Sequence, residues 1–93
     1  MSADNGVYIL QTKGPEYRVC YGSAIDNLYE GFNDTTLKWI PNMKEVRDMF
    51  CESKVFSELE DAFDYAHEIA KDYEYLEDGV CLIADFKEEK FDR

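Results

Sequence analysis

The segment from Val55 to Phe86 constrains the fold more than any other part of the sequence. Its first half predicts an amphipathic helix, because apolar residues recur there at spacings of three and four. These residues are Leu59, Ala62, Phe63, Ala66, Ile69 and Ala70. A stripe of this kind must be covered by another element, so the helix is expected to pack on a sheet.

The boundaries of this helix and of the strand after it are also marked in the sequence. Ser57 and Glu60 have the spacing of a capping box, and the helix is expected to reach about Lys71–Asp72. Gly79 then opens the apolar run Val80–Phe86. A strand that is apolar on both faces is typical of a central position, so we predict that this strand lies inside the sheet.

The first third of the chain predicts a β-hairpin. Val7–Thr12 and Tyr17–Gly22 are rich in residues that favour strands, and Lys13–Glu16 between them carries a Gly-Pro turn signal. The hairpin is therefore expected to have a four-residue loop.

The middle of the chain has a weaker pattern. Ala24–Tyr29 fits either an extension of the second strand or a loop, and Glu30–Thr35 is expected to be irregular. Thr36–Ile40 alternates as a short strand would, and Pro41 is expected to end it. A first helix is predicted over Asn42–Glu52.

The face of this first helix that is expected to pack inward carries Met43, Val46, Met49 and Phe50. Lys54–Phe56, which follows it, fits either a short strand or a linker. The fold class predicted from all these elements is α+β, a two-layer sandwich of three to five antiparallel or mixed strands with both helices on one face. The helix stripes are expected to pack against Ile9, Val19 and Leu82.

The chain length of 93 residues predicts a single domain, residues 1–93. Residues 1–6 are expected to be a polar leader, and residues 87–93 a charged tail that frays.

The net charge of −11 is concentrated in the second part of the chain. Residues 57–93 carry 13 acidic and 4 basic side chains, a net charge of −9. Direct binding to nucleic acid is therefore not expected, because phosphates need cationic partners. The same charge would attract a basic protein. Acidic surfaces are also common simply because they keep proteins soluble.

The sequence contains no recognisable catalytic, cofactor or metal motif. Its three cysteines form no C-x-x-C, its glycines are isolated, and His67 lies next to Glu68 without the spacing of a zinc-protease helix. We therefore expect a protein that is not an enzyme and has no cofactor. The cysteine pattern and the lack of an apolar leader favour a cytoplasmic location, and no apolar run is long enough to cross a membrane.

The acidic helix and the connection after it form the candidate partner-binding surface. Carboxylates along a rigid helix could imitate a row of phosphates, and tyrosines beside them could anchor an interface. The residues assigned to this surface are Asp61, Asp64, Tyr65, Glu68, Asp72, Tyr73 and Glu74. A run of charge is more often only a solvated face, so this role is a hypothesis.

Four stretches of the sequence resemble a family of small, acidic, uncharacterised proteins of bacteriophages and prophages. They are A-D-N-G-V-Y-I-L from Ala3, G-P-E-Y-R-V from Gly14, K-V-F-S-E-L-E-D-A-F-D-Y-A from Lys54, and L-E-D-G-V from Leu76. The resemblance implies a phage context. Small acidic phage proteins often bind and block a host or defence protein, as anti-CRISPR proteins do.

Three functions are therefore considered. The first is a non-enzymatic phage-type protein in the host cytoplasm that inhibits a basic host or antiviral-defence protein, in the manner of an anti-CRISPR or a DNA mimic. The second is a domain that sequesters or degrades a small ligand or nucleotide in a pocket around Trp39 and Arg18. The third is a structural or assembly protein, with a homo-oligomer as one form.

Overall fold

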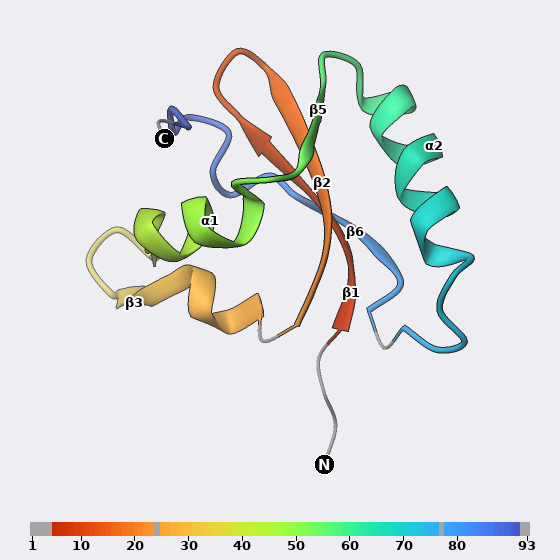
Figure 1. Ribbon diagram of the computed structural model, residues 1–93. Coiled ribbons are helices and arrows are strands. Elements are labelled where there is room, and N and C mark those ends of the chain that lie inside the picture. Colours follow the sequence, from red (N-terminus) through yellow and green to blue (C-terminus); the bar gives the residue numbers. More distant parts are fainter. Residues whose placement is uncertain (1–4, 24, 77, 92–93) are drawn as a thin grey trace.

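The strand β1 (Asn5–Thr12) lies inside a four-stranded sheet and pairs there with the next strand of the chain and with its last strand (Figure 1). The computed structural model describes residues 5–23, 25–76 and 78–91. The remaining elements, in chain order, are β2 (Glu16–Ser23), η1 (Ile25–Leu28), β3 (Tyr29–Asn33), β4 (Lys38–Pro41), α1 (Met43–Phe50), β5 (Lys54–Phe56), α2 (Leu59–Ala70) and β6 (Val80–Ile83). The strand order is β5-β2-β1-β6, and β3 and β4 form a separate two-stranded sheet.

The hairpin predicted at the start of the chain is confirmed. β1 pairs antiparallel with β2 from Asn5 opposite Ser23 to Thr12 opposite Glu16. Glu16 belongs to the second strand, so the loop has three residues instead of four. β6 pairs parallel with β1, and β5 pairs antiparallel with β2, which makes the sheet mixed.

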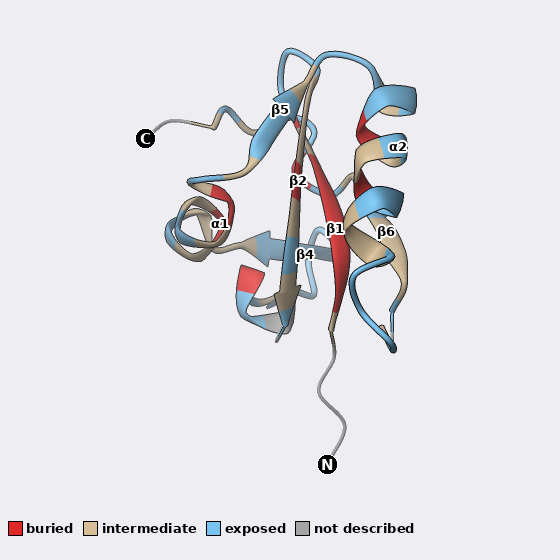
Figure 2. Cartoon of the chain, turned by 45° about the vertical axis from the view of Figure 1, so that its right-hand side comes forward, coloured by how far each residue is buried: buried red, intermediate tan, exposed pale blue. Residues whose placement is uncertain are grey.

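β1 is buried on both of its faces because its side chains alternate between two apolar cores (Figure 2). Tyr8 and Leu10 point into a core that also contains Val46 and Phe50 of α1. Val7 and Ile9 point into a second core with Ala62 and Ala66 of α2. The two helices therefore cover opposite faces of the sheet.

This arrangement confirms the α+β class and the mixed sheet but differs from the prediction that both helices share one face. The physical reason is the unbroken apolar run Val7–Leu10, which leaves no face of β1 that could remain in water. The inward residues predicted for both helices are confirmed. Val46 and Phe50 are buried with Met43 and Met49 packed beside them, and the α2 stripe contacts Ile9 and Val19.

The last strand, β6, lies at an edge of the sheet and not in its centre. The inner positions are taken by β1 and β2, which are linked by a short loop and pair over eight residues, whereas β6 has four residues. Ile83 is 8% exposed and belongs to the α1-side core, but Leu82 is 39% exposed. The prediction that Leu82 belongs to the core under the helices is therefore wrong.

The middle of the chain is more regular than its composition suggests. η1 occupies the stretch for which a strand or a loop was considered, and Glu30–Thr35, which was expected to be irregular, supplies most of β3. β3 and β4 pair antiparallel with a shift in register between Tyr29 and Gly31. The side-chain oxygen of Asn33 accepts hydrogen bonds from the backbone of Thr35 and Thr36 and closes the turn.

The starts of the two helices differ in how they are capped. At α1, the side chain of Asn42 accepts a hydrogen bond from the backbone N–H of Glu45. The capping box predicted from Ser57 is wrong, because α2 begins at Leu59 and its N-cap residue is Glu58, which makes no side-chain capping bond. Ser57 lies one residue too early to reach the free N–H groups.

The C-terminal segment is docked on the sheet as far as Phe91, contrary to the expectation that it frays. Phe86 is fully buried, and Phe91 packs against the α1-side core. The backbone of Lys13 also donates a hydrogen bond to the carbonyl of Glu89. The expected polar leader falls mainly on residues 1–4, outside the described residues, while Asn5 and Gly6 belong to β1.

The burial of β6 on one face only can be tested with two neighbouring substitutions. We expect Ile83→Ala to lower the free energy of unfolding by about 2–5 kcal/mol, because it opens a cavity in a core. Leu82→Ala removes a side chain of similar size that is 39% exposed, so it leaves no closed cavity and its loss should be clearly smaller. Urea unfolding of both variants measures the difference. Equal losses would mean that β6 is buried on both faces.

Candidate functional site

The outer flank of α2 carries three of the predicted site residues at helical spacing. Asp61, Asp64 and Glu68 are exposed. Spacings of three and four place neighbouring carboxylates on one side of the helix, with Cβ atoms roughly 5–6 Å apart. Glu68 lies 3.2 Å from the ammonium of Lys71 in a solvent-exposed ion pair, whereas Asp61 and Asp64 have no ion pair within the described residues.

The C-terminal end of α2 turns back onto the sheet. The backbone N–H groups of Asp72 and Tyr73 donate to the carbonyls of Ile69 and Ala70, which continues the helix for about one turn. The Tyr73 ring then stacks on Tyr21 of β2, with centroids 4.3 Å apart and planes 6° from parallel. This stack fixes the acidic connection against the α2 side of the sheet.

Tyr21 also belongs to this surface, although it was not among the residues predicted from the sequence. Asn5 lies beside it, and its side-chain amide donates to the Tyr21 hydroxyl and to the carbonyl of Tyr75, both at 3.4 Å. Tyr21 shares a face of β2 with Tyr17 and Val19, because alternate side chains of a strand point to the same side. Only the packing of α2 on that face brings it to Tyr73.

The charges at the two ends of α2 have different effects on the helix. Glu60 and Asp61 lie in the first turn, where the helix dipole favours negative charge. Asp72 and Glu74 are exposed just beyond the last turn, where the dipole disfavours it. Their presence there is not explained by helix stability.

Tyr65 is less accessible than an interface anchor would be. Its ring is half-buried, packs against the α2-side core and lies 5.4 Å from the ring of Phe56. The ammonium of Lys54 lies 5.2 Å from the Tyr65 ring. The structure thus brings Asp61, Asp64 and Glu68 together on the flank of α2. The Tyr65 side chain is half-buried against the core instead.

The thiols that the structure places near the core are protonated at neutral pH. Burial raises the pKa of the Cys20 thiol to about 12. Burial, and then the charge of Asp78, raises the pKa of Cys81. A thiol acts as a nucleophile in its thiolate form, so neither side chain is activated. Within residues 5–23, 25–76 and 78–91, no group of three or more His, Cys, Asp or Glu side chains is arranged to hold a metal ion.

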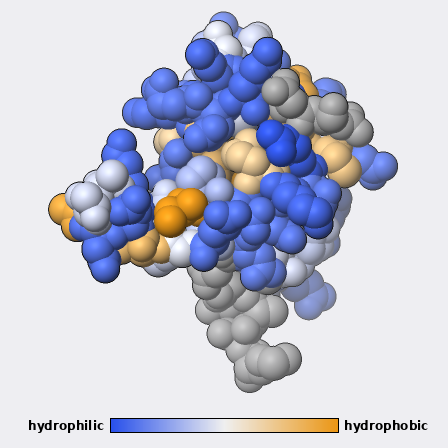
Figure 3. Space-filling view, turned by 90° about the vertical axis from the view of Figure 1, so that its left-hand side faces the viewer, coloured by the Kyte–Doolittle hydropathy of each residue, from blue (hydrophilic) through white to orange (hydrophobic). Residues whose placement is uncertain are grey.

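A separate cleft lies beside the β3–β4 hairpin. It has a volume of about 510 Å³ and is lined by Tyr29, Glu30, Gly31, Trp39 and Asp85. Trp39 is 58% exposed and its neighbour Phe32 is 44% exposed, so these aromatic side chains are not part of the core. On the side of the molecule that carries α1 and β3, hydrophobic side chains appear as small groups in a mostly hydrophilic surface (Figure 3).

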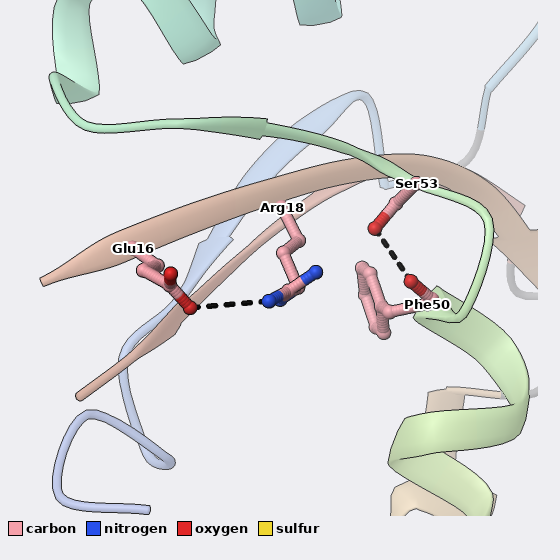
Figure 4. A network of polar contacts seen from close by, with 4 residues as sticks. All are labelled: Glu16, Arg18, Phe50 and Ser53. Atoms are coloured by element: carbon pink, nitrogen blue, oxygen red, sulfur yellow. Dashed lines mark hydrogen bonds and ion pairs between the residues drawn. The ribbon is translucent and has the colours of Figure 1, made fainter. Parts of the chain in front are cut away.

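Arg18 does not contribute to this cleft, although a pocket around Trp39 and Arg18 was considered. Its guanidinium lies 3.1 Å from the Glu16 carboxylate, close to Phe50 (Figure 4), and 3.9 Å from the centre of the Phe91 ring. The Arg18 side chain is mostly buried by these contacts. It is therefore not available to bind a phosphate beside Trp39.

Comparison with known proteins gives no match: no protein-family model, no curated protein and no solved structure is significantly similar to this chain. No helix among the described residues is long and apolar enough to cross a membrane.

The tyrosine stack can be tested by a double-mutant cycle. We expect Tyr21→Ala and Tyr73→Ala to be coupled by about 0.5–1.5 kcal/mol, the typical energy of an aromatic pair beyond its buried area. Tyr75→Ala is the control, because Tyr75 is 75% exposed, and it should show no coupling to Tyr21→Ala. Urea unfolding of the single and double variants gives these energies. Additive losses for Tyr21 and Tyr73 would show that the stack does not hold the connection.

Proposed function

We propose that this chain is a non-enzymatic, acidic, phage-type protein that binds and inhibits a basic host or antiviral-defence protein. The observation that carries the proposal is the exposed flank of α2, where Asp61 and Asp64 have no ion pair among the described residues. The surface continues through Glu68, Asp72 and Glu74 to the Tyr21–Tyr73 stack.

The physical basis is electrostatic attraction combined with an aromatic contact. Carboxylates at fixed spacing on a helix present a row of negative charge without flexible linkers, as a nucleic acid does, and they would steer a basic groove toward the helix. Tyr73 is already ordered by its stack on Tyr21, so less conformational entropy is lost when a partner covers it. The pattern thus supports competition with nucleic acid for a basic groove.

The position of the charges favours binding over solubility alone. Solubility requires net charge but no particular location. Asp72 and Glu74, however, lie at the end of α2 where the dipole opposes them, next to an ordered aromatic pair. Charge that is unfavourable for the helix and adjacent to a contact residue is typical of an interface.

A nucleotide-binding function has less support. The cleft beside Trp39 is lined by the carboxylates of Glu30 and Asp85, which would repel phosphate groups. The cation that could have offset them, Arg18, contacts Glu16 and Phe91 instead.

The proposal is tested by capture of partners from a bacterial host lysate with three forms of the protein. One form is unchanged, and the second carries Asp61→Lys, Asp64→Lys and Glu68→Lys. The third carries Asp34→Lys, Asp48→Lys and Glu52→Lys, which make the same change in net charge at exposed positions away from α2. Circular dichroism and thermal unfolding confirm that all three are folded.

We expect the unchanged protein and the third form to retain a basic partner, and the α2 variant to bind it about tenfold more weakly or worse, since three exposed charge contacts are reversed. Binding should weaken as salt is raised. A partner that binds the α2 variant as well as the unchanged protein, or whose binding is insensitive to salt, would contradict the proposal.

A further inference from the structure

The cleft beside the β3–β4 hairpin has one wall that is fixed to the core. The Tyr29 hydroxyl donates a 2.6 Å hydrogen bond to the Asp85 carboxylate, which links the hairpin to the segment after β6. The Tyr29 ring also stacks on Phe86, with centroids 5.5 Å apart, and Phe86 is fully buried. This wall is therefore already in place before any ligand enters.

The second wall is the indole of Trp39. Its centroid lies 5.6 Å from that of Tyr29, and Phe32 meets it edge-on at 5.2 Å. Trp39 thus contacts two aromatic rings while more than half of its surface stays in water. An exposed indole of this kind presents a negative π-face to whatever enters the cleft.

The charged residues of the cleft are both acidic. Glu30 and Asp85 line it, and no cationic side chain does so within the described residues. A second cleft of about 430 Å³ lies against Trp39 as well, but it is lined by Lys38 and Lys87 together with Asp85 and Glu88, so its charges are balanced. Of the two clefts that share Trp39, the first is therefore acidic and the second has no net charge.

We propose that the cleft lined by Tyr29 and Trp39 binds an alkylammonium group. Aromatic faces attract an organic cation through their quadrupoles, and Trp is the strongest of them. Glu30 and Asp85 supply the opposite charge. An anion would be repelled by both carboxylates, and a neutral apolar group would leave them without a counter-charge. The volume of about 510 Å³ lies in the range of small-ligand sites.

This site is distinct from the acidic flank of α2, and the inference does not depend on the proposed function. The ammonium could belong to a free amine or to a lysine side chain on another protein. Both sources present the same chemistry to the cleft, so the experiment includes a probe of each kind.

Fluorescence tests the proposal directly because Trp39 is the only tryptophan in the chain. The intact protein is titrated with tetramethylammonium chloride, and separately with a short lysine peptide blocked at both ends. Sodium chloride at equal ionic strength and tert-butyl alcohol, which is similar in shape but neutral, serve as controls. We expect saturable changes with the two cations only. Tighter binding of the peptide would identify a protein-borne lysine, and tighter binding of tetramethylammonium a free amine.

Two conservative variants locate the binding site. Asp85→Asn removes the charge but keeps an oxygen that can accept the Tyr29 hydrogen bond, and Glu30→Gln removes the other charge. Each should weaken cation binding by about two- to fivefold, the upper part of the range for an exposed ion pair. Glu88→Gln makes the same charge change in the second cleft and should leave binding unchanged, with thermal unfolding as a check on all three variants.

Three results would overturn the proposal. The first is a Trp39 signal that responds equally to tetramethylammonium, sodium chloride and tert-butyl alcohol. The second is tighter binding of sodium acetate, titrated in the same way, than of the cations. The third is a loss of affinity in Glu88→Gln equal to that in Asp85→Asn.

Discussion

The whole structure depends on the burial of β1 on both faces. Val7 and Ile9 contact α2, while Tyr8 and Leu10 contact α1, and β1 also pairs with both β2 and β6. The chain after the hairpin therefore has to cover both faces of β1. The segment from η1 to α1 covers one face, and α2 covers the other on its way to β6. Each fully buried large apolar side chain contributes about 1.5–3 kcal/mol, so β1 supplies a large part of the folding free energy.

The same arrangement separates the two surfaces to which we assign binding. The acidic flank belongs to α2 and the connection after it, on one face of the sheet, and the Trp39 cleft belongs to the hairpin on the side of α1. Because each is supported by its own core, substitutions on one surface should leave the other intact. We propose that the acidic flank offers charge to a large basic partner, whereas the cleft offers aromatic faces to a single cationic group.

Patterns that involve only neighbouring residues predicted the structure well. The β1–β2 hairpin and the inward faces of both helices follow from side-chain periodicity, and so does the exposure of Asp61, Asp64 and Glu68. Features set by contacts across the fold could not be predicted in this way. The edge position of β6, the docking of Phe91, the Tyr21–Tyr73 stack and the half-buried state of Tyr65 depend on which elements meet. β3 was missed because Gly31 and Asn33 have low strand propensity and pairing with β4 overrides it.

Amide hydrogen exchange measured by NMR tests the central position of β1 most directly. The account predicts that the amides of Val7–Leu10 exchange only when the whole protein unfolds, with the free energy found by urea unfolding. The amides of β3 and β4 belong to an isolated two-stranded sheet and should exchange faster through local opening. If the β1 amides exchanged as fast as those of β3 and β4, or faster than those of α2, β1 would not be the strand on which the fold depends.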